Sequence, residues 1–366
     1  MNIRVGILTA PAIRCERCAE GVWLRGVRIG IGFHWDRTED QLFEGEMEIR
    51  DNADGTQTAI NTLDVEDYLT SVITSEMAAT SSPELLKAHA VISRSWVLRP
   101  MLACRDLPAM HGWSNTPDRR IVWYERDAHT GFDVCADDHC QRYEGITRRD
   151  ANKETAKRVK EAVEATRGLV LVDPTDHDAI CDTRFYKCCG GRTELFENAW
   201  APKHYRYLES VDCPYCNTKN ERVLKQVLNS YDYETQDFYR WTVRYTAQEL
   251  AQIIRERSGI DLGEIIALNP IKRGPSGRIY ELEIVGSRHR MVVGKELEIR
   301  KWLSRSCLYS SAFEVERDGT DWLLRGKGWG HGVGLCQIGA AVMADQGCTY
   351  EQILAHYYPG AQLKQV

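Results

Sequence analysis

Two histidines and two cysteines lie within twelve residues of the chain, at His129, Cys135, His139 and Cys140. Imidazole nitrogens and thiolates are ligands that zinc prefers, and a closed set of four leaves no open position for catalysis. His139 and Cys140 are neighbours, so both can reach one ion only from a turn, because successive side chains of a strand point to opposite faces. A disulfide between Cys135 and Cys140 is the alternative. The residue types favour a structural zinc site.

Other cysteines are also grouped along the chain, which contains thirteen in all, so that at least one is unpaired if the others form disulfides. The further groups are Cys15 with Cys18, Cys188 with Cys189, and Cys213 with Cys216. Adjacent Cys188 and Cys189 do not easily bond each other, so their partners must be distant, for example Cys213 or Cys216. These last four thiols form either disulfides or a second metal site, and the sequence leaves both open.

A carboxylate that could act as an acid, Glu76, lies between two helical patterns. Apolar residues at positions 65, 68, 69, 72 and 73 predict a helix that begins after Asp64. Pro83 marks the start of a second helix, which we expect to end at Pro100. Glu76 is therefore either an exposed charge at a helix end or a catalytic acid held between two rigid elements.

Two cations on the second predicted helix, Lys87 and Arg94, are seven residues apart and share one face. Small and apolar residues such as Ala90 and Val91 lie between them. This face is either solvated or lines a groove beside Glu76.

A glycine-rich stretch near the C-terminus has five glycines between Gly328 and Ala341, with His331, Cys336 and Gln337 among them. Glycine serves where the backbone turns sharply or approaches another group closely. The stretch is either a tight loop that leads into a helix or a wall of a binding cleft, with His331 and Gln337 as its polar groups. A cysteine enzyme built on Cys336 and His331 is a more remote alternative.

The elements that position these residues predict an α+β fold. We expect a mixed helix and β-sheet core, an inserted smaller α/β module and a long substrate groove. Residues 1–60 alternate apolar and polar side chains as strands do, and residues 61–204 form the catalytic core with the metal cluster. Residues 205–320 form the inserted module, and residues 321–366 complete the core with the glycine-rich stretch and the last helices.

The composition excludes some classes of function. The 366 residues carry a net charge of −6 without a long basic block, so we expect no nucleic-acid partner. No apolar run approaches about 18 residues, so we expect no membrane span. Met1 to Ile13 is a poor secretory signal and a better first strand. Ten tryptophans and sixteen tyrosines offer flat surfaces on which sugar rings can stack.

Several motifs in one order resemble the SpoIID/LytB family, cell-wall proteins named for stage II sporulation protein D and an amidase enhancer. The motifs are Asp64 to Met77, Glu84 to Trp96, Gln141 to Gly145, Gly190 to Glu194, Gly328 to Ala340 and His356 to Gly360. The resemblance implies a lytic transglycosylase of the cell envelope, periplasmic or extracellular, that cleaves peptide-stripped glycan strands of peptidoglycan. It implies that Glu76 is the catalytic acid and that the histidine and cysteine cluster holds zinc. We expect substrate contacts from Lys87, Arg94, Tyr143, Tyr186, Arg192, Thr193, His331 and Gln337.

One carboxylate is enough for that reaction. A glycosidase normally needs two, whereas here the C6 hydroxyl of the sugar itself attacks C1, and Glu76 serves as both acid and base. The alternatives are ordinary hydrolysis, with Glu66 or Asp67 as the partner carboxylate, and a non-catalytic glycan-binding protein. The second would scaffold the wall machinery or enhance a cell-wall amidase, as some relatives do.

Overall fold

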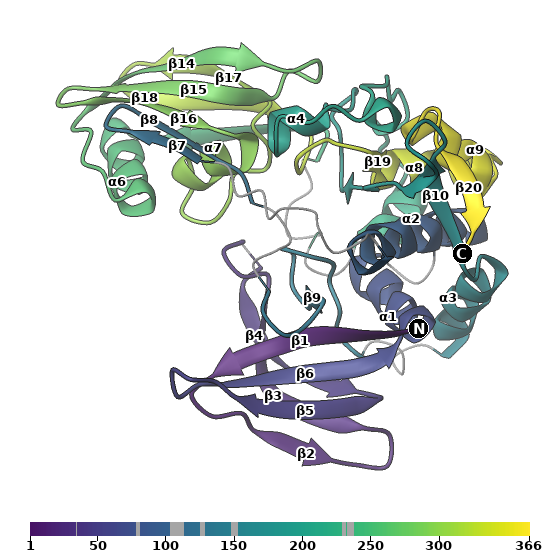
Figure 1. Ribbon diagram of the computed structural model, residues 1–366. Coiled ribbons are helices and arrows are strands. Elements are labelled where there is room, and N and C mark those ends of the chain that lie inside the picture. The colour runs from purple at the N-terminus through teal and green to yellow at the C-terminus, as the bar shows by residue number, and fades with distance from the viewer. Residues whose placement is uncertain are drawn as a thin grey trace.

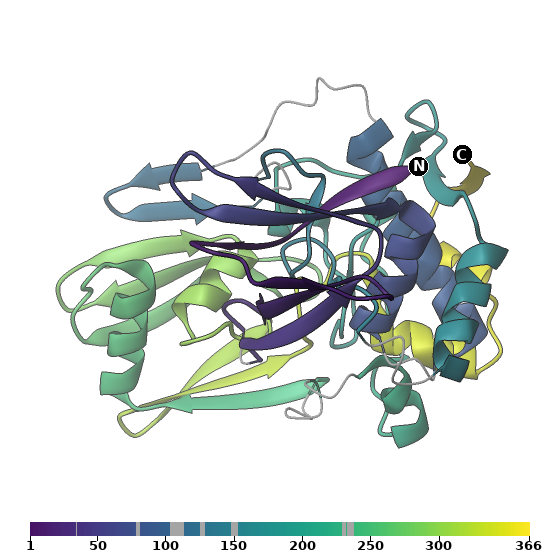
Figure 2. The same ribbon diagram turned by 90° about the horizontal axis from the view of Figure 1, so that it is seen from below.

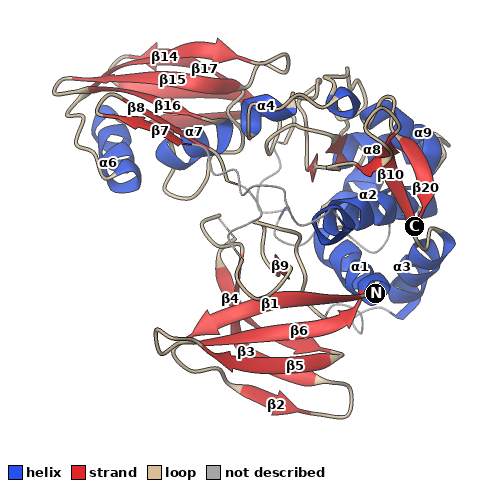
Figure 3. Ribbon diagram, viewed as in Figure 1, coloured by secondary structure: helices blue, strands red, loops and turns tan. Residues whose placement is uncertain are grey.

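The computed structural model describes residues 1–33, 35–77, 81–102, 113–124, 129–147, 153–228, 232 and 238–366. Its helices and strands form a mixed α+β fold with several small sheets (Figure 1). Most helices gather around one part of the molecule, and strands dominate the other two parts (Figure 3). Buried apolar side chains form two separate clusters, one large and one confined to residues 241–324.

The N-terminal residues form two small sheets, as the alternating pattern predicts. One sheet has the order β5-β6-β1-β9, and the other has the order β2-β3-β4. The bounds are β1 Asn2–Ala10, β2 Cys15–Arg17, β3 Val22–Ile29, β4 Arg37–Phe43, β5 Glu46–Asp51, β6 Gln57–Asp64 and β9 Val134–Cys135. Figure 2 shows these strands from below, in front of the other parts of the molecule. Because β9 pairs in parallel with β1, the predicted metal-binding segment is attached to the first sheet.

Three long helices pack together beside these sheets. Their bounds are α1 Val65–Glu76, α2 Pro83–Leu102 and α3 Lys153–Ala165. The Asp64 side chain caps α1 by accepting a hydrogen bond from the Glu66 amide. The predicted end of α2 at Pro100 is wrong, because the helix continues through this residue to Leu102. A small sheet of β10 (Leu169–Asp173), β11 (Ala179–Ile180) and β20 (Gln362–Gln365) covers α2.

The module between residues 240 and 327 has its own apolar core. Its three-stranded sheet contains β13 Arg240–Tyr245, β17 Phe313–Asp318 and β18 Asp321–Lys327. Its five-stranded sheet contains β14 Ile265–Arg273, β15 Ile279–Gly286, β16 Arg290–Gly294, β8 Arg119–Val122 and β7 Trp113–Thr116. The helices α6 (Ala247–Ser258) and α7 (Glu296–Trp302) pack on these strands. The sheets therefore also take strands from outside the predicted range of 205–320, because β8 pairs with β16 and β18 with β13.

The remaining elements return the chain to the helical part. They are β12 Phe185–Tyr186, α4 Phe196–Ala199, the short 3-10 helix Arg206–Leu208, α5 Glu221–Val227, β19 Leu335–Cys336, α8 Gln337–Asp345 and α9 Tyr350–Tyr357. The strand β19 pairs in parallel with β12, so the glycine-rich stretch lies beside residues 185–186. In the described part of the chain, no helix is long and apolar enough to cross a lipid bilayer.

The glycines of this stretch approach the protein's own backbone. Gly328 has a φ of 74°, and a Cβ there would lie 2.7 Å from the carbonyl oxygen of Cys189. At Gly334, the carbonyl of Arg184 occupies the corresponding place. The expectation of close approach is met, and at these two glycines the neighbouring group is the backbone of another segment of the core.

Candidate functional site

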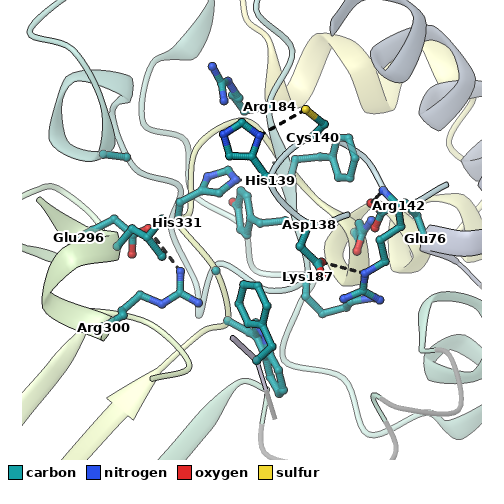
Figure 4. Close-up of a pocket in the computed structure, with 18 of the residues that line it drawn as sticks. Glu76, Asp138, His139, Cys140, Arg142, Arg184, Lys187, Glu296, Arg300 and His331 are labelled. Atoms are coloured by element: carbon teal, nitrogen blue, oxygen red, sulfur yellow. Dashed lines mark hydrogen bonds and ion pairs between the residues drawn. The ribbon is translucent and has the colours of Figure 1, made fainter. Parts of the chain in front are cut away.

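A cavity of about 240 Å³ lies where the end of α1, the segment 138–142, β12, the glycine-rich stretch and α7 meet. Figure 4 shows Glu76 and Arg142 on one side of it, and Glu296 with Arg300 on the other. Its wall is rich in aromatic and charged groups, which include Trp35, Trp200, Trp329, Arg142, Arg184 and Lys187. Flat rings and cations are suited to the faces and the acidic groups of a sugar chain.

Glu76 is the last residue of α1, and its side chain lines this cavity. Its Oε1 atom accepts a hydrogen bond of 3.0 Å from the backbone N–H of Arg142. Burial raises the pKa of Glu76 above its ordinary value, and the charge of Asp138 acts in the same direction. The charges of Arg142 and Lys187 oppose this shift but do not cancel it. A raised pKa keeps more of this carboxyl protonated near neutral pH.

The other carboxylates of the cavity that the structure describes are paired with cations. Asp138 lies 2.8 Å from Arg142, and Asp232 lies 2.8 Å from Lys187. Glu296 lies 3.4 Å from Arg300. Glu76 differs, because its hydrogen bond in the described part of the chain comes from a backbone amide. It is therefore the cavity carboxyl best suited to give up a proton.

Sequence reasoning missed these cations, although two of them lay in stretches that it had singled out. Arg142 belongs to the Gln141 to Gly145 motif, and Lys187 directly precedes the Cys188–Cys189 pair. Arg142 also lies over the Trp35 ring at 4.7 Å.

His331 lies in the cavity wall as predicted, but its ring nitrogens are both occupied. Nδ1 accepts from the Val333 amide at 3.1 Å, and Nε2 is 3.0 Å from the carbonyl oxygen of Phe185, to which it donates. Burial and the nearby charges of Arg184 and Arg278 hold the pKa of His331 well below its ordinary value. The imidazole is thus neutral and fixed, so it offers the cavity a ring edge and no free donor for a sugar hydroxyl.

Gln337 and Tyr186 also line the cavity. Gln337 Nε2 lies 3.3 Å from His89 Nε2 and donates a hydrogen bond to it. His89 can accept this bond because burial lowers its pKa to about 3 and leaves the imidazole neutral. Tyr186 packs against His331 with ring centroids 5.2 Å apart. The structure therefore brings Glu76, Tyr186, His331 and Gln337 into one site.

Arg94 and Lys87 do not reach the cavity. Arg94 is fully buried and forms two hydrogen bonds, of 3.0 and 2.6 Å, with the carboxylate of Glu66. Lys87 pairs with Glu84 at 2.7 Å and lies over the Tyr350 ring. Internal partners occupy both cations and neither lines the cavity, so the substrate contacts expected of them stay a prediction that this site does not support.

Three other expected contact residues also lie outside this cavity. Tyr143 is buried in the core, where its hydroxyl donates to Asn61. Arg192 pairs with Asp212 at 2.8 Å, and the buried Thr193 hydroxyl accepts from the Val211 amide. Their motifs serve the fold by these contacts.

The carboxylates considered as partners for hydrolysis are far from Glu76. Glu66 and Asp67 lie in the first turn of α1, and Glu76 ends the same helix. At a rise of 1.5 Å per residue, ten residues separate two groups by about 15 Å. Paired glycosidase carboxylates lie roughly 5–9.5 Å apart, so neither residue can act with Glu76 in this arrangement.

The predicted ligands His129, Cys135, His139 and Cys140 converge within 4.8 Å of one another. Cys140 Sγ lies 3.2 Å from His129 Nε2 and 3.4 Å from His139 Nδ1, and Cys135 Sγ lies 3.9 Å from that same His139 nitrogen. Ligands of a tetrahedral zinc ion lie about 3.6 Å apart for sulfur and nitrogen, given the usual bond lengths. Residues 138–139 form the turn that adjacent ligands require. This His–Cys cluster can hold a zinc ion, and His139 and Cys140 also line the cavity.

A second group of four thiols is fully enclosed by the protein. Cys189, Cys213, Cys216 and Cys336 lie within 4.8 Å of one another and could hold a metal such as zinc. Three of them are among the four thiols expected to meet, but Cys336 takes the place of Cys188. The alternative of Cys336 as a nucleophile loses support, because its thiol is buried in this four-cysteine cluster.

Comparison with known proteins supports the resemblance. Residues 53–172 match the family described as Stage II sporulation protein, SpoIID, and residues 194–334 match a domain of unknown function, DUF8618. The chain is 27% identical over 307 residues to stage II sporulation protein D of Bacillus subtilis (strain 168), a match that covers 84% of this chain and 76% of that protein.

Two further relatives are matched over a smaller share of their own length. An uncharacterised protein of Brachyspira hyodysenteriae is 28% identical over 315 residues, which cover 84% of this chain and 68% of that protein. The amidase enhancer of Bacillus subtilis is 38% identical over 66 residues, or 18% of this chain and 9% of the enhancer. Residues 53–172 thus form a SpoIID domain, and the chain is a distant homologue of stage II sporulation protein D and of the amidase enhancer.

Proposed function

We propose that this protein is a lytic transglycosylase that cleaves the β-1,4 bond between N-acetylmuramic acid and N-acetylglucosamine in glycan strands stripped of peptides. The observation that carries the proposal is Glu76, a carboxyl with a raised pKa in a cavity whose other described carboxylates form ion pairs. The SpoIID domain supports the substrate class.

In the proposed reaction, protonated Glu76 donates its proton to the glycosidic oxygen. The bond between that oxygen and C1 of the muramic acid breaks, and the N-acetylglucosamine leaves with a free 4-hydroxyl. The Glu76 carboxylate then removes the proton from the C6 hydroxyl of the same muramic acid as that oxygen bonds to C1. The product is a 1,6-anhydro ring, and Glu76 ends the cycle protonated. The nucleophile belongs to the substrate, so the attack is intramolecular and carries an entropic advantage.

Substrate binding is assigned to groups that line the cavity. Arg142, Arg184 and Lys187 would bind lactyl carboxylates and acetamido oxygens, because they line the cavity and Lys87 and Arg94 do not. Each of the three is itself paired with an aspartate, so a bound glycan would share or replace that partner. Trp35 and Trp200 would stack on sugar rings.

His129, Cys135, His139 and Cys140 would hold a structural zinc ion, which supplies rigidity. Because Asp138 and Arg142 flank these ligands, such rigidity would fix the segment whose Arg142 amide binds Glu76. This activity places the protein in the cell envelope, with glycan strands as its partner.

The second candidate is a glycan-binding protein that enhances an amidase, which the local similarity to the amidase enhancer favours. Incubation of the purified chain with peptide-free glycan strands, followed by mass analysis of the products, separates the candidates. New 1,6-anhydromuramic ends support the proposal. New reducing ends indicate hydrolysis, and intact strands that remain bound to the protein indicate the enhancer.

A further inference from the structure

The four-cysteine cluster is assembled from three segments that are distant in the sequence. Cys189 follows β12, Cys213 and Cys216 flank the Pro-Tyr pair of one turn, and Cys336 is the N-cap of α8. All four side chains are buried. A spacing of two residues between paired cysteines is usual in structural zinc sites.

The sulfur positions fit one metal ion. Cys189 Sγ and Cys216 Sγ are 3.4 Å apart, and all four sulfur atoms lie within 4.8 Å of one another. A disulfide needs a separation of about 2.05 Å, whereas zinc–sulfur bonds of about 2.3 Å in a tetrahedron place the sulfurs about 3.8 Å apart. The arrangement is therefore that of a mononuclear site.

Hydrogen-bond donors surround these sulfur atoms. Cys336 Sγ accepts from the amides of Cys189 and Gly339, each at 3.4 Å, and Cys189 Sγ accepts from the Gly191 amide at 3.4 Å. Cys213 Sγ lies 3.2 Å from the Tyr357 hydroxyl. Such donors stabilise thiolates, and the N-terminal end of α8 adds a favourable dipole at Cys336.

The packing around the cluster leaves little freedom. A Cβ at Gly339 would lie 2.7 Å from Cys213 Sγ and would also meet the Tyr357 hydroxyl. A set of buried thiolates needs a cation, because isolated charges are strongly disfavoured in the interior. The oriented donors fit thiolates around an ion, and the lack of space for a side chain at Gly339 shows that the sulfur atoms are closely packed.

We infer that Cys189, Cys213, Cys216 and Cys336 bind one zinc ion, and that this ion fixes the cavity wall that carries Lys187, Trp329 and Gln337. Lys187 precedes Cys189 by two residues, and Gln337 directly follows Cys336. Trp329 is held to the same strand segment, because its N–H donates to the Cys188 carbonyl at 2.7 Å. The zinc ion would add to the backbone hydrogen bonds that already join these segments, and it would tie the turn of Cys213 and Cys216 to both of them.

The first test measures zinc and free thiols on the purified full chain and its variants. We expect two equivalents of zinc in the wild type, one in Cys213→Ser/Cys216→Ser and one in Cys135→Ser/Cys140→Ser. Cys181→Ala is the matched control, since it removes a buried thiol outside both clusters, and it keeps two.

The Cys135→Ser/Cys140→Ser variant also tests the four-cysteine cluster, because it leaves the four cysteines of that cluster unchanged. After exchange of zinc for cobalt, this variant should show the visible absorption of a tetrahedral all-thiolate site. The inference is overturned if the Cys135→Ser/Cys140→Ser protein contains no zinc. It is also overturned if the mass of this protein is lower by two hydrogens for each disulfide formed among the four cysteines. If the His–Cys cluster instead proves empty, the wild type holds one zinc ion and the Cys135→Ser/Cys140→Ser variant keeps it. The inference then stands, whether or not the protein cleaves glycan strands.

The effect on the cavity wall is measured as affinity for uncleaved peptide-free glycan strands, which does not depend on catalysis. Cys213→Ser should weaken this binding, and Cys181→Ala should leave it unchanged. Unchanged binding by a Cys213→Ser variant that has lost its zinc contradicts the positioning role.

Discussion

The two clusters of metal-ligating side chains differ in how they are assembled and in which wall of the cavity they support. The His–Cys cluster comes from twelve consecutive residues, is partly exposed and lies beside the segment that binds Glu76. The four-cysteine cluster joins three distant segments, is fully buried and lies behind Lys187 and Gln337. The wall that carries Glu76 thus lies beside a locally organised cluster, and the wall that carries Lys187 and Gln337 lies beside a cluster that depends on tertiary assembly.

In this comparison of the two cavity walls, we expect the largest effect from the substitution Glu76→Gln. General acid–base catalysis contributes roughly 10²–10⁴-fold, so we expect the variant to lose at least that factor in the rate of strand cleavage. Binding of glycan should be largely kept, because the amide has nearly the same shape. Rates are measured on peptide-free strands.

Asp67→Asn, exposed on the same helix, is the control and should cleave at the wild-type rate. A Glu76→Gln variant as active as the wild type would remove the reacting group from this wall.

The helix that carries Glu76 is also joined to α2 by the buried pair of Arg94 and Glu66. Removing one partner of a buried ion pair costs about 3–5 kcal/mol, so Arg94→Ala should lower the free energy of unfolding by about that amount. Lys87→Ala, which breaks a more exposed pair, should cost about 0–1 kcal/mol. Denaturant unfolding measures both. Equal stability losses would contradict the structural weight given to the Arg94–Glu66 pair. A loss of glycan affinity by a stable Arg94→Ala protein would support Arg94 as a binding residue.

Disruption of the two clusters should have different consequences. Cys135→Ser/Cys140→Ser should lower kcat by roughly 10–100-fold, the range for loss of groups that orient a site, because the segment beside Glu76 is released. Cys213→Ser should act mainly on KM, because it releases the binding wall. Steady-state kinetics on defined glycan strands separate the two. The same kinetic change in both variants would mean that the clusters do not serve separate walls.

The smallest effect concerns the charge of Lys187, which lies on the binding wall but lowers the pKa of Glu76. The reaction starts from protonated Glu76, so activity falls as the pH rises through that pKa. Removal of the cation in Lys187→Met raises the pKa, and the freed Asp232 acts in the same direction. The alkaline limb of the pH profile should therefore move to higher pH, by roughly one unit or less. A shift to lower pH would show that another group controls this limb.

Local features of the fold were predictable from the sequence. The Asp64 cap defines the start of α1, and Thr246 with Gly259 bounds α6, because capping depends on neighbouring residues. The hairpin around Asp318 and Gly319 was predictable because a turn also depends on neighbouring residues. The addition of β7 and β8 to the sheet of a later module was not, since strand pairing over such a distance leaves no local pattern.

Prediction of the site residues has the same limit, because contacts between distant segments leave no local pattern in the sequence. The set from His129 to Cys140 was found because its spacing is local. Cys336 was not assigned to the second cluster, because it follows Cys216 by 120 residues. The pairing of Arg94 with Glu66 was not predicted, because helical spacing gives the face of a side chain but not its partner.

The proposed single-carboxyl mechanism is tested most directly by cleavage of peptide-free glycan strands by the wild-type protein in water labelled with oxygen-18. We expect anhydromuramic ends without the label, because the attacking oxygen comes from the C6 hydroxyl of the sugar and Glu76 only moves protons. Muramic acid ends that carry one labelled oxygen at C1 would show that water attacks, and would contradict the single-carboxyl mechanism.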